Sequence, residues 1–371
     1  KNPNIIELPE PQEGKGYIAE VDLEYPHELH DVHNNYPLAP EHMRPEILAE
    51  YQESLLDGAR HVPTPKLCLN LNDKKNYVVH HETLKYYLSK GLKLTKIRRI
   101  LHFSESPWMA PYIIKNTQLR KQAKTPFEKD YFKLLINSIV GKTMENVRNR
   151  IDVRLTGQRR EKLKLIKNPR FKSTKDINPN LSAFIMGKSS VTLDKPLYVV
   201  AAILDLAKLK MYLLWDEIKE QYPTAQQLYT DTDSFLDFIK TKDVYGEINL
   251  NNYDTRNYTE DHHCNSLKNK TVPGQLKDEM GGEVISGFFV TRSKSYAVKV
   301  GGTTVKRLKS VKKSAIRYLG YDDYKNCILQ STPGPMVEIN IIGSDLHLIR
   351  NKKFVKKTLS AFDDKRYYYD S

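Results

Sequence analysis

The alternation of apolar and polar positions at residues 228–239 predicts a β-hairpin. Leu228 leads into the polar stretch 229–234, whose Thr, Asp and Ser residues favour a turn. The β-prone residues that follow this stretch are Phe235, Leu236, Phe238 and Ile239. We therefore predict a strand, a tight turn and a returning strand, with the carboxylates of Asp231 and Asp233 at the tip.

Two helices are predicted upstream of this hairpin, at about residues 111–124 and 126–148. The second begins with a capping box, because Thr125 can act as the N-cap, Pro126 takes the first helical position and Glu128 can reach back to the cap. Its apolar side consists of Phe132, Leu135, Ile136 and Ile139. The short break between the two helices indicates an antiparallel pair.

One stripe of the second helix carries Lys133, Asn137 and Gly141 at spacings of four. An ammonium group, an amide and a position without a side chain could together face a nucleotide, contacting its phosphate and its sugar or base edge. The alternative is an ordinary amphipathic helix with a solvated lysine, and the segment alone leaves both interpretations open.

A further helix is predicted directly before the hairpin. Its apolar positions recur at spacings of four, four, three and four, at Ile203, Ala207, Met211, Leu214 and Ile218. The first hundred or so residues contain many prolines and predict short strands and loops. Among them, 77–80 is predicted to be a strand and 82–88 a helix that ends at Gly91.

Composition indicates a folded, basic protein. The 371 residues are 39% hydrophobic and 10% aromatic, which is ordinary for a globular chain, and the formal net charge is +14. Basic residues are concentrated at 142–175, where twelve stand against three acids, and at 305–317, where there are six and no acid. Such runs fit contact with nucleic-acid phosphates, although a dense run is also typical of a solvated face.

The composition gives little support to a disulfide-rich, zinc-binding or membrane protein. The three cysteines are scattered with no paired spacing, so neither a disulfide framework nor a zinc site is indicated. The run His262-His263-Cys264 is interpreted as a polar loop, because adjacent side chains splay apart. The longest apolar stretch, 198–204, is far shorter than the ~18 residues of a membrane helix. We expect no membrane partner and an intracellular protein, in the nucleus or cytoplasm of its host.

The two carboxylates at the hairpin tip are candidate metal ligands. Hard divalent cations prefer oxygen ligands, and Asp231 and Asp233 could bridge two Mg²⁺ ions about 3.5–4 Å apart, as nucleotidyl transfer requires. The alternative is that Asp and Thr only favour a turn here.

Three motifs together resemble those of family B DNA polymerases. The pattern Lys133-x-x-x-Asn137-Ser138-x-x-Gly141 resembles motif B, and 229–234 resembles motif C. The pair Lys294 and Tyr296 resembles the Lys-x-Tyr element with which the protein-primed branch holds the primer end. Longer stretches that resemble the protein-primed polymerases of Polinton/Maverick transposons and related viruses are 20–26, 35–41, 91–96, 141–146 and 362–366.

This resemblance implies an α+β fold: a family B palm with an antiparallel sheet, helical fingers and a small C-terminal thumb. The implied segments are the palm and a first insertion (1–110), the fingers (111–148), a basic second insertion (149–195), the palm with motif C (196–300), and the thumb (301–371). The implied activity is template-directed addition of dNTPs to a primer 3′-hydroxyl or to the hydroxyl of a terminal protein, replicating a transposon, virus or linear plasmid. Two Mg²⁺ ions would serve as cofactors, with Mn²⁺ as an alternative.

The resemblance also implies a role for each site residue. Asp231 and Asp233 would hold the metals. The nucleotide would be contacted by Lys133, Asn137, Gly141, Lys121 and Arg120. Primer and template DNA would be contacted by Tyr229, Thr230, Lys294, Tyr296, Lys309, Lys312 and Lys313.

Two departures from the family pattern bear on activity. Val140 stands where motif B usually has an aromatic residue. The motif A strand, which supplies a further metal-binding Asp, is not found, because the segment from Asp22 to Tyr25 has too short a spacing. We interpret Asp22 as structural and expect the chain to be the C-terminal part of a longer polymerase, without motif A or an exonuclease domain and inactive alone. The alternative is a non-catalytic nucleic-acid-binding remnant; a metal-dependent nuclease is a weaker third option, since the Lys133 helix would then have no role.

Overall fold

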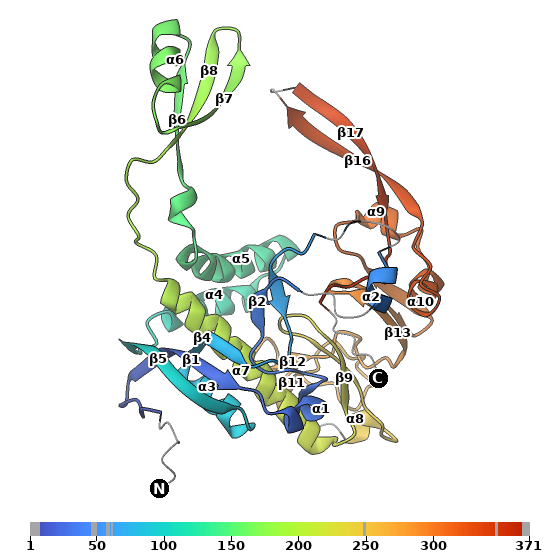
Figure 1. The fold of residues 1–371 in the computed structure, drawn as a ribbon. Helices are drawn as coiled ribbons and strands as arrows, with labels where there is room; N and C mark the ends of the chain where they lie inside the picture. The colour runs from blue at the N-terminus through green and yellow to red at the C-terminus, as the bar shows by residue number, and fades with distance from the viewer. Residues whose placement is uncertain are drawn as a thin grey trace. The chain divides into compact units, whose positions relative to one another are not determined.

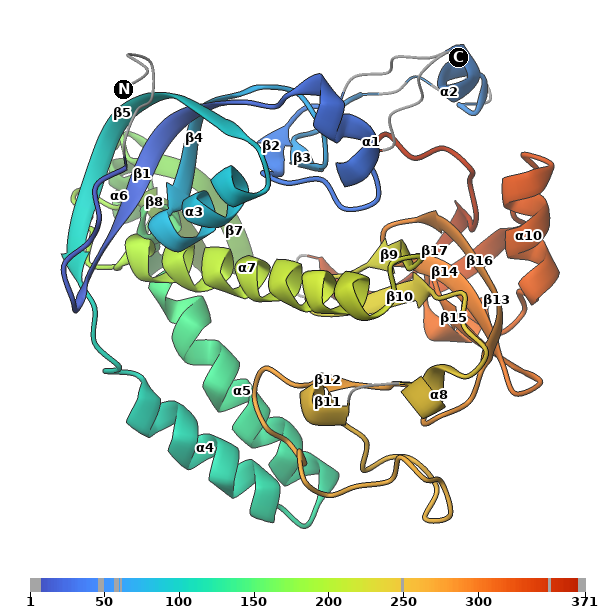
Figure 2. The ribbon, with the colours of Figure 1, turned by 90° about the horizontal axis from the view of Figure 1, so that it is seen from below.

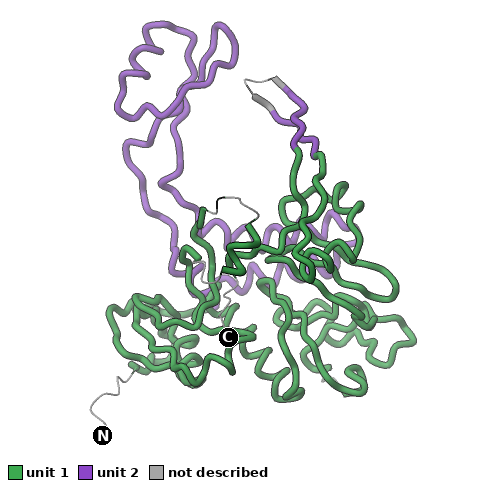
Figure 3. Tube along the Cα trace, turned by 45° about the vertical axis from the view of Figure 1, so that its right-hand side comes forward, with its two compact units in different colours: residues 1–106, 204–338, 355–371 green, residues 107–203, 339–354 purple. Residues whose placement is uncertain are grey.

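The computed structural model describes residues 8–45, 50–56, 60, 62–247, 250–345 and 348–365, without the side chains of 344, 345 and 348. Helices and small, mostly antiparallel sheets are mixed along the chain, so the predicted α+β class is confirmed (Figure 1). The chain divides into two compact units, 1–106 with 204–338 and 355–371, and 107–203 with 339–354 (Figure 3). The division into palm, fingers, insertions and thumb stays a prediction, because compactness does not identify these parts.

The first unit contains a three-stranded antiparallel sheet in the order β4-β1-β5. Its strands are β1 (Lys15–Glu24), β4 (Lys74–His80) and β5 (Lys93–Ser104), and helix α3 (His81–Ser89) follows β4 directly. The predictions of a strand at 77–80 and a helix at 82–88 are therefore confirmed. Gly91 ends this segment with a φ of +101°, a conformation that favours glycine.

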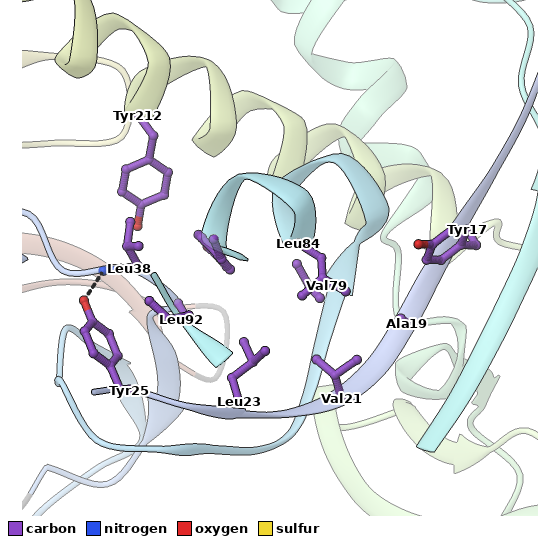
Figure 4. Close-up of a cluster of buried hydrophobic side chains, with 12 residues drawn as sticks. Tyr17, Ala19, Val21, Leu23, Tyr25, Leu38, Val79, Leu84, Leu92 and Tyr212 are labelled. Carbon is purple, nitrogen blue, oxygen red and sulfur yellow. Dashed lines mark hydrogen bonds between the residues drawn. The ribbon is translucent and has the colours of Figure 1, made fainter. Parts of the chain in front are cut away.

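The main hydrophobic core lies between this sheet and two helices. Side chains from β1 such as Val21 and Leu23 point toward Leu84 of α3 and Tyr212 of α7 (Leu197–Gln221) (Figure 4). Burying each aliphatic side chain of this kind stabilises the fold by about 1.5–3 kcal/mol. Tyr212 is also fixed at its polar end, because its hydroxyl donates to the carbonyl of Pro37 at 2.9 Å. This core anchors the helix that precedes the hairpin.

Helix α7 is the predicted core helix, although the apolar positions singled out from the sequence are buried only in its second half. Met211, Leu214 and Ile218 are buried, whereas Ile203 is half-buried and Ala207 is exposed. The helix leads through a short turn into β9 (Gln226–Thr230), which pairs with β10 (Phe235–Phe238) in antiparallel register. A second hydrophobic cluster forms under the hairpin, made up of Ile218, Tyr222 and Ala225 with Trp215, Phe235, Ile239 and Val244 packed against it. The predicted hairpin is therefore confirmed, and one helix face supports it (Figure 2).

A second three-stranded sheet in the first unit has the order β13-β14-β15. Its strands are β13 (Ile285–Arg292), β14 (Ser295–Val300) and β15 (Thr303–Arg307), followed by the helices α9 (Lys313–Ile316) and α10 (Tyr321–Leu329). Its core consists of Ala297, Leu308, Ile316, Leu319, Tyr324, Cys327 and Leu359. Strands β13 and β14 are joined by a tight turn that contains Lys294.

The second unit begins with the predicted helix pair, α4 (Ala110–Gln122) and α5 (Pro126–Thr143). The capping box is formed, since the Thr125 hydroxyl accepts from the Glu128 amide at 3.2 Å and the Glu128 carboxylate accepts from the Thr125 amide at 3.0 Å. The Tyr112 hydroxyl donates to the carbonyl of Leu135, which joins the two helices.

Helix α5 ends five residues earlier than predicted, so the expected end at 148 was wrong. A 3-10 turn, η2 (Val147–Asn149), follows it instead. The Asn146 side chain accepts from the Arg148 amide at 3.1 Å and so offers the backbone a local alternative to the helix. The rest of the unit includes a sheet in the order β6-β8-β7 with helix α6. Their bounds are β6 (Ile151–Thr156), α6 (Arg159–Ile166), β7 (Phe171–Asn178) and β8 (Leu181–Gly187).

The remaining elements are short or lie at the edges. They are η1 (His27–Leu29), α1 (His30–His33), β2 (Glu41–Met43), α2 (Glu50–Ser54), β3 (Lys66–Cys68), α8 (Val244–Glu247), η3 (Leu250–Asn252), β11 (Tyr253–Asp254), β12 (Leu276–Lys277), β16 (Met336–Asp345) and β17 (Leu348–Lys357). Within the described ranges, no helix has the length and apolar character needed to span a bilayer.

Candidate functional site

The tip of the β9–β10 hairpin is a four-residue turn that presents two carboxylates. The Asp231 amide donates to the Ser234 carbonyl at 3.2 Å, and the Asp233 amide donates to the Asp231 carbonyl at 2.7 Å. Thr232, between the two acids, has a φ of +61°, which is unfavourable for a β-branched residue. The turn therefore stores local strain at the two predicted metal ligands, as functional sites often do.

Lys294 joins this tip to the second sheet of the same unit. Its Nζ lies 2.9 Å from each carboxylate oxygen of Asp231, and its backbone amide donates to the Tyr229 hydroxyl at 2.9 Å. The hydrogen bond to Asp231 raises the pKa of Lys294, so the side chain stays a cation. Lys294 itself has a φ of +61° in the β13–β14 turn. Two strained turns, 63 residues apart in sequence, thus meet through one ion pair.

An aromatic cluster supports this contact. The ring centroids of Tyr229 and Tyr296 lie 5.3 Å apart, and each ring lies 6.0 Å from Phe288. Burial raises the pKa of Tyr229, so its hydroxyl remains protonated while it accepts from Lys294. The structure therefore brings together Tyr229, Asp231, Lys294 and Tyr296, four of the residues singled out from the sequence.

A cavity of about 660 Å³ opens beside Asp231 and Lys294. Its cationic lining residues are Lys294, Lys306, Arg307, Lys309, Lys313 and Arg317, and Asp231 is its one acid. Tyr296 and three aliphatic side chains complete the lining. This excess of positive charge suits a polyanion whose end lies at the carboxylate, since clefts with one sign of charge concentrate counter-ions.

The cavity refines the expectation for the basic run 305–317. Lys309 and Lys313 line it as the sequence indicated, whereas Lys312 does not. Lys306, Arg307 and Arg317 were not singled out as site residues, yet they line it as well. Side chains alternate between the two faces of a strand, so the sequence of β15 could have indicated that Lys306 and Arg307 point to opposite faces. It could not have indicated that both residues border the cavity.

Asp231 and Asp233 at the hairpin tip are the predicted metal ligands. Asp231 and Asp233 offer only oxygen donors, which suit Mg²⁺ rather than softer transition metals. In the part of the chain that the structure describes, two groups of three or more potential metal ligands occur, and neither includes these two acids. Among the described residues, no third ligand thus joins the two acids in one tight group.

Asp22 is structural, as predicted. Its carboxylate accepts from Arg98 Nε at 2.8 Å and from the second guanidinium nitrogen at 2.7 Å, and it also accepts from the Asn76 amide at 2.9 Å. These hydrogen bonds lower the pKa of Asp22 to about 2, with the Arg98 contact as the largest cause. The acid ties β1 to β4 and β5, which leaves its oxygens engaged within the sheet.

The predicted nucleotide-binding residues lie in the second unit. Lys133, Asn137 and Gly141 are all exposed along one face of α5, and no atom lies within 4 Å of where a Gly141 Cβ would stand. Packing within the chain therefore does not explain why residue 141 lacks a side chain. Lys121 is exposed and Arg120 half-buried in the last turn of α4. Their meeting with the hairpin of the first unit stays a prediction.

The loop with His262, His263 and Cys264 gathers its three potential ligand atoms within 4.8 Å. The side chains are nevertheless already engaged. The carbonyl of Tyr245 lies 3.1 Å from His263 Nε2 and accepts from Cys264 Sγ at 3.4 Å, and the Cys264 amide donates to His262 Nδ1 at 3.1 Å. These hydrogen bonds engage the three residues within the chain, but the expectation that adjacent side chains splay apart was wrong, because the rings of His262 and His263 stack with their centroids 4.8 Å apart.

One acid was missed in the sequence. Asp237 of β10 pairs with the buried Gln227 of β9, and its Oδ1 has no hydrogen-bond partner among the described residues. Burial raises the pKa of Asp237 to about 7. The pattern 235–239 placed this residue in a strand, but its burial depends on how the hairpin packs, which no local signal encodes.

Comparison with known proteins gives little beyond the fold. No protein-family model matches the chain, and no curated protein matches it. The chain is similar to a solved structure of phi29 DNA polymerase complexed with primer-template DNA, at 11% sequence identity and a TM-score of 0.48, over 92% of this chain and 50% of that one. The chain thus spans about half the length of that polymerase, and a likeness at this level supports no argument about activity.

Proposed function

We propose that this chain is the part of a protein-primed family B DNA polymerase that holds motifs B and C, and that it serves template-directed DNA synthesis. The observation that carries the proposal is the joining of the Asp231–Asp233 tip to Lys294 and Tyr296 at the edge of the basic cavity. A turn-forming Asp-x-Asp alone has many explanations. The same turn bound to a Lys-x-Tyr element beside five further cations is suited to transfer to a primer end.

In this proposal the carboxylates hold the metal ions and the cations hold DNA. Bound Mg²⁺, or Mn²⁺, would lower the pKa of the attacking hydroxyl and neutralise the triphosphate and leaving pyrophosphate. Asp231 and Asp233 would offer their oxygens from one hydrogen-bonded turn. Lys294 contacts a primer phosphate, Tyr296 packs against the terminal sugar, and Tyr229 and Thr230 support that end. The remaining cavity cations, together with Lys312 at its margin, neutralise the duplex backbone without reading sequence.

The second unit would bind the incoming nucleotide. Lys133, with Lys121 and Arg120, neutralises the dNTP triphosphate, Asn137 contacts its sugar or base edge, and Gly141 leaves room for the nascent base pair. The exposed stripe on α5 and the open space at Gly141 support these roles. The acceptor is a primer 3′-hydroxyl or the hydroxyl of a terminal protein, and the element replicated is a transposon, virus or linear plasmid in the nucleus or cytoplasm of a host.

Primer extension and DNA binding by residues 1–371 test the proposal together. We expect binding whose log affinity falls with log salt at a slope of about −0.9 per phosphate contacted. We expect no extension until a segment that provides the further carboxylate is joined to the chain, because the described residues bring none to the tip. Salt-independent binding would contradict the role of the cavity, and extension by residues 1–371 alone would show that another acid completes the site.

The second candidate is a non-catalytic DNA-binding remnant, favoured by the same shortage of ligands at the tip. Such a remnant would make the same cationic contacts with DNA as the polymerase, and it would differ only in not catalysing nucleotidyl transfer. If the chain binds primer-template as expected but remains inactive after the further carboxylate is supplied, this candidate replaces the polymerase. A nuclease would instead degrade the primer in Mg²⁺, which the same assay detects.

A further inference from the structure

A second cluster of potential metal ligands lies far from the hairpin in sequence, where β4, α3 and the end of β5 meet. His80 is the last residue of β4, His81 is the first of α3, and Glu105 directly follows β5. The two histidine side chains are 2% and 4% exposed, whereas the Glu105 side chain is 44% exposed. Their imidazole centroids lie 4.3 Å apart. Two buried rings therefore converge below a carboxylate that faces solvent.

Three of the four ring nitrogens of this cluster lack a well-formed hydrogen bond. His80 Nε2 and both nitrogens of His81 are buried, and none has a hydrogen-bond partner among the described residues. Leaving such a group unpaired costs about 1–3 kcal/mol, and most buried polar atoms in folded proteins are paired. Their nearest acceptors are the carboxylates of Glu82 and Glu105, 3.2–3.7 Å away, so the chain itself satisfies these three nitrogens only weakly.

The distances in the cluster match those between ligands of one tetrahedral ion. Glu105 Oε1 lies 3.5 Å from His80 Nε2 and 3.7 Å from His81 Nε2. Ligand atoms about 2.0–2.1 Å from a zinc ion lie about 3.4 Å from one another. One ligand atom from each of the three residues falls within 4.8 Å of the others, so a small inward shift would complete the set.

We propose that His80, His81 and Glu105 bind a divalent transition-metal ion of the zinc type, which clips the end of β5 to the junction of β4 and α3. The site is independent of the proposed polymerase activity. Two imidazoles and one carboxylate suit zinc and leave a fourth position for water, on the side where Glu105 is exposed. The ion would enter along that side.

The surroundings of the site orient two of its ligands. Glu82 Oε1 lies 3.2 Å from His81 Nδ1 and would accept its proton, which directs the lone pair of Nε2 toward Glu105, as outer carboxylates do at zinc sites. A Cβ on Gly16 would collide with the Glu105 carboxylate and stand 2.9 Å from His81 Nε2. Glycine at this position in β1 thus leaves the room that the carboxylate occupies.

One contact opposes metal binding and limits the affinity. His80 Nδ1 accepts from the Glu82 amide at 3.3 Å, so the free ring carries its proton on Nε2. Coordination through Nε2 moves that proton to Nδ1 and breaks this hydrogen bond. Because the bond is long, its loss weakens the site without abolishing it. We therefore expect weaker binding than at a site made of thiolates.

Zinc titration of residues 1–371, followed by Co²⁺ substitution, tests the site. We expect one equivalent of Zn²⁺, a rise in Tm on binding, and a visible Co²⁺ spectrum without thiolate charge transfer, because no cysteine takes part. Glu105→Gln should weaken Zn²⁺ binding at least about tenfold and abolish the rise in Tm. Since Glu105 is exposed, the metal-free Tm of this variant should equal that of the unsubstituted chain, which separates ligand loss from misfolding.

Matched variants distinguish this site from the other candidates. Glu10→Gln removes an exposed carboxylate of the same unit and should leave Zn²⁺ affinity unchanged, as should Cys264→Ser and Asp231→Asn. The proposal is overturned if Glu105→Gln binds Zn²⁺ as tightly as the original chain, if binding is lost only in Cys264→Ser, or if the chain binds no Zn²⁺. The last result would mean that contacts with Glu82 and Glu105 alone account for the buried ring nitrogens.

Discussion

Asp22 and Asp231 are both carboxylates that bind a cation through two oxygens, yet they differ in every property that matters for chemistry. Asp22 faces the rigid fork of Arg98 and also accepts a backbone amide, in the middle of a sheet. Asp231 faces the single ammonium of Lys294, at a strained turn that borders a cavity. A guanidinium fork fixes geometry, whereas an ammonium on a flexible stem can exchange for another cation or a phosphate. The partner, rather than the acid, distinguishes the structural site from the site that we propose to be reactive.

The largest expected effect comes from removing the acids themselves. In a polymerase that contains this chain and the further carboxylate, Asp231→Asn or Asp233→Asn should abolish nucleotide addition, because a lost metal ligand removes several kcal/mol of transition-state stabilisation. Primer-template affinity should stay within a few fold. Asp22→Asn is the matched control: it should lower Tm and leave the extension rate per folded molecule unchanged. Normal extension by either tip variant, measured in Mg²⁺, would remove the distinction between the two acids.

The local signals in the sequence were sufficient for the hairpin that carries Asp231 and for helix α5, but they did not locate the ten-residue strand β1 that carries Asp22. Thr and Asp between β-prone residues predicted the hairpin, and Thr125 with Glu128 predicted the start of α5. The motif order also pointed to Lys294. The ion pair with Asp231 could not be predicted, because it depends on how two turns 63 residues apart pack together. The burial of Asp237 and the convergence of His80 with Glu105 were missed for the same reason.

Asp237 is a third acid to compare, because burial and not a neighbouring cation shifts its pKa. Its substitution should give the next largest effect. Its pKa is raised from 3.8 to about 7, so the folded protein holds this proton more tightly than the unfolded chain does. The contribution of this protonated carboxyl group to stability is therefore fully present below about pH 4, and it is lost as the pH rises through about 7. Asp237→Asn should remove this loss and stabilise the protein by roughly 2–4 kcal/mol at pH 8, with little effect at pH 4.

Urea unfolding of both proteins across this pH range measures the effect. Asp22 should behave in the opposite sense, since its pKa is lowered to about 2: its contribution is present above pH 3.8 and is lost as the pH falls toward 2. A stability difference between the Asp237→Asn variant and the original chain that does not change with pH would show that Asp237 is hydrated rather than buried.

Removing the cationic partner of each acid tests the comparison directly. Lys294→Ala should weaken primer-template binding by about three- to tenfold through loss of one phosphate contact, with little change in Tm. Arg98→Ala should do the reverse, lowering Tm because Asp22 loses its partner and leaving DNA affinity unchanged. Fluorescence anisotropy with a labelled primer-template and thermal unfolding give the two readouts. Equal loss of DNA affinity in both variants would mean that the affinity reflects overall charge and not the site.

The smallest expected effect is the difference between variants of two adjacent lysines, Lys312 and Lys313. Lys313 lines the cavity beside Asp231 and Lys312 does not, although both carry the same charge one residue apart in sequence. If the cavity holds the DNA backbone, Lys313→Ala should reduce the slope of log affinity against log salt by about 0.9, whereas Lys312→Ala should change it less. Neither side chain caps helix α9, so both variants should fold alike. Identical slopes for the two variants would place the DNA on the general basic surface of 305–317, and the Asp231–Lys294 contact would then lose its link to the primer end.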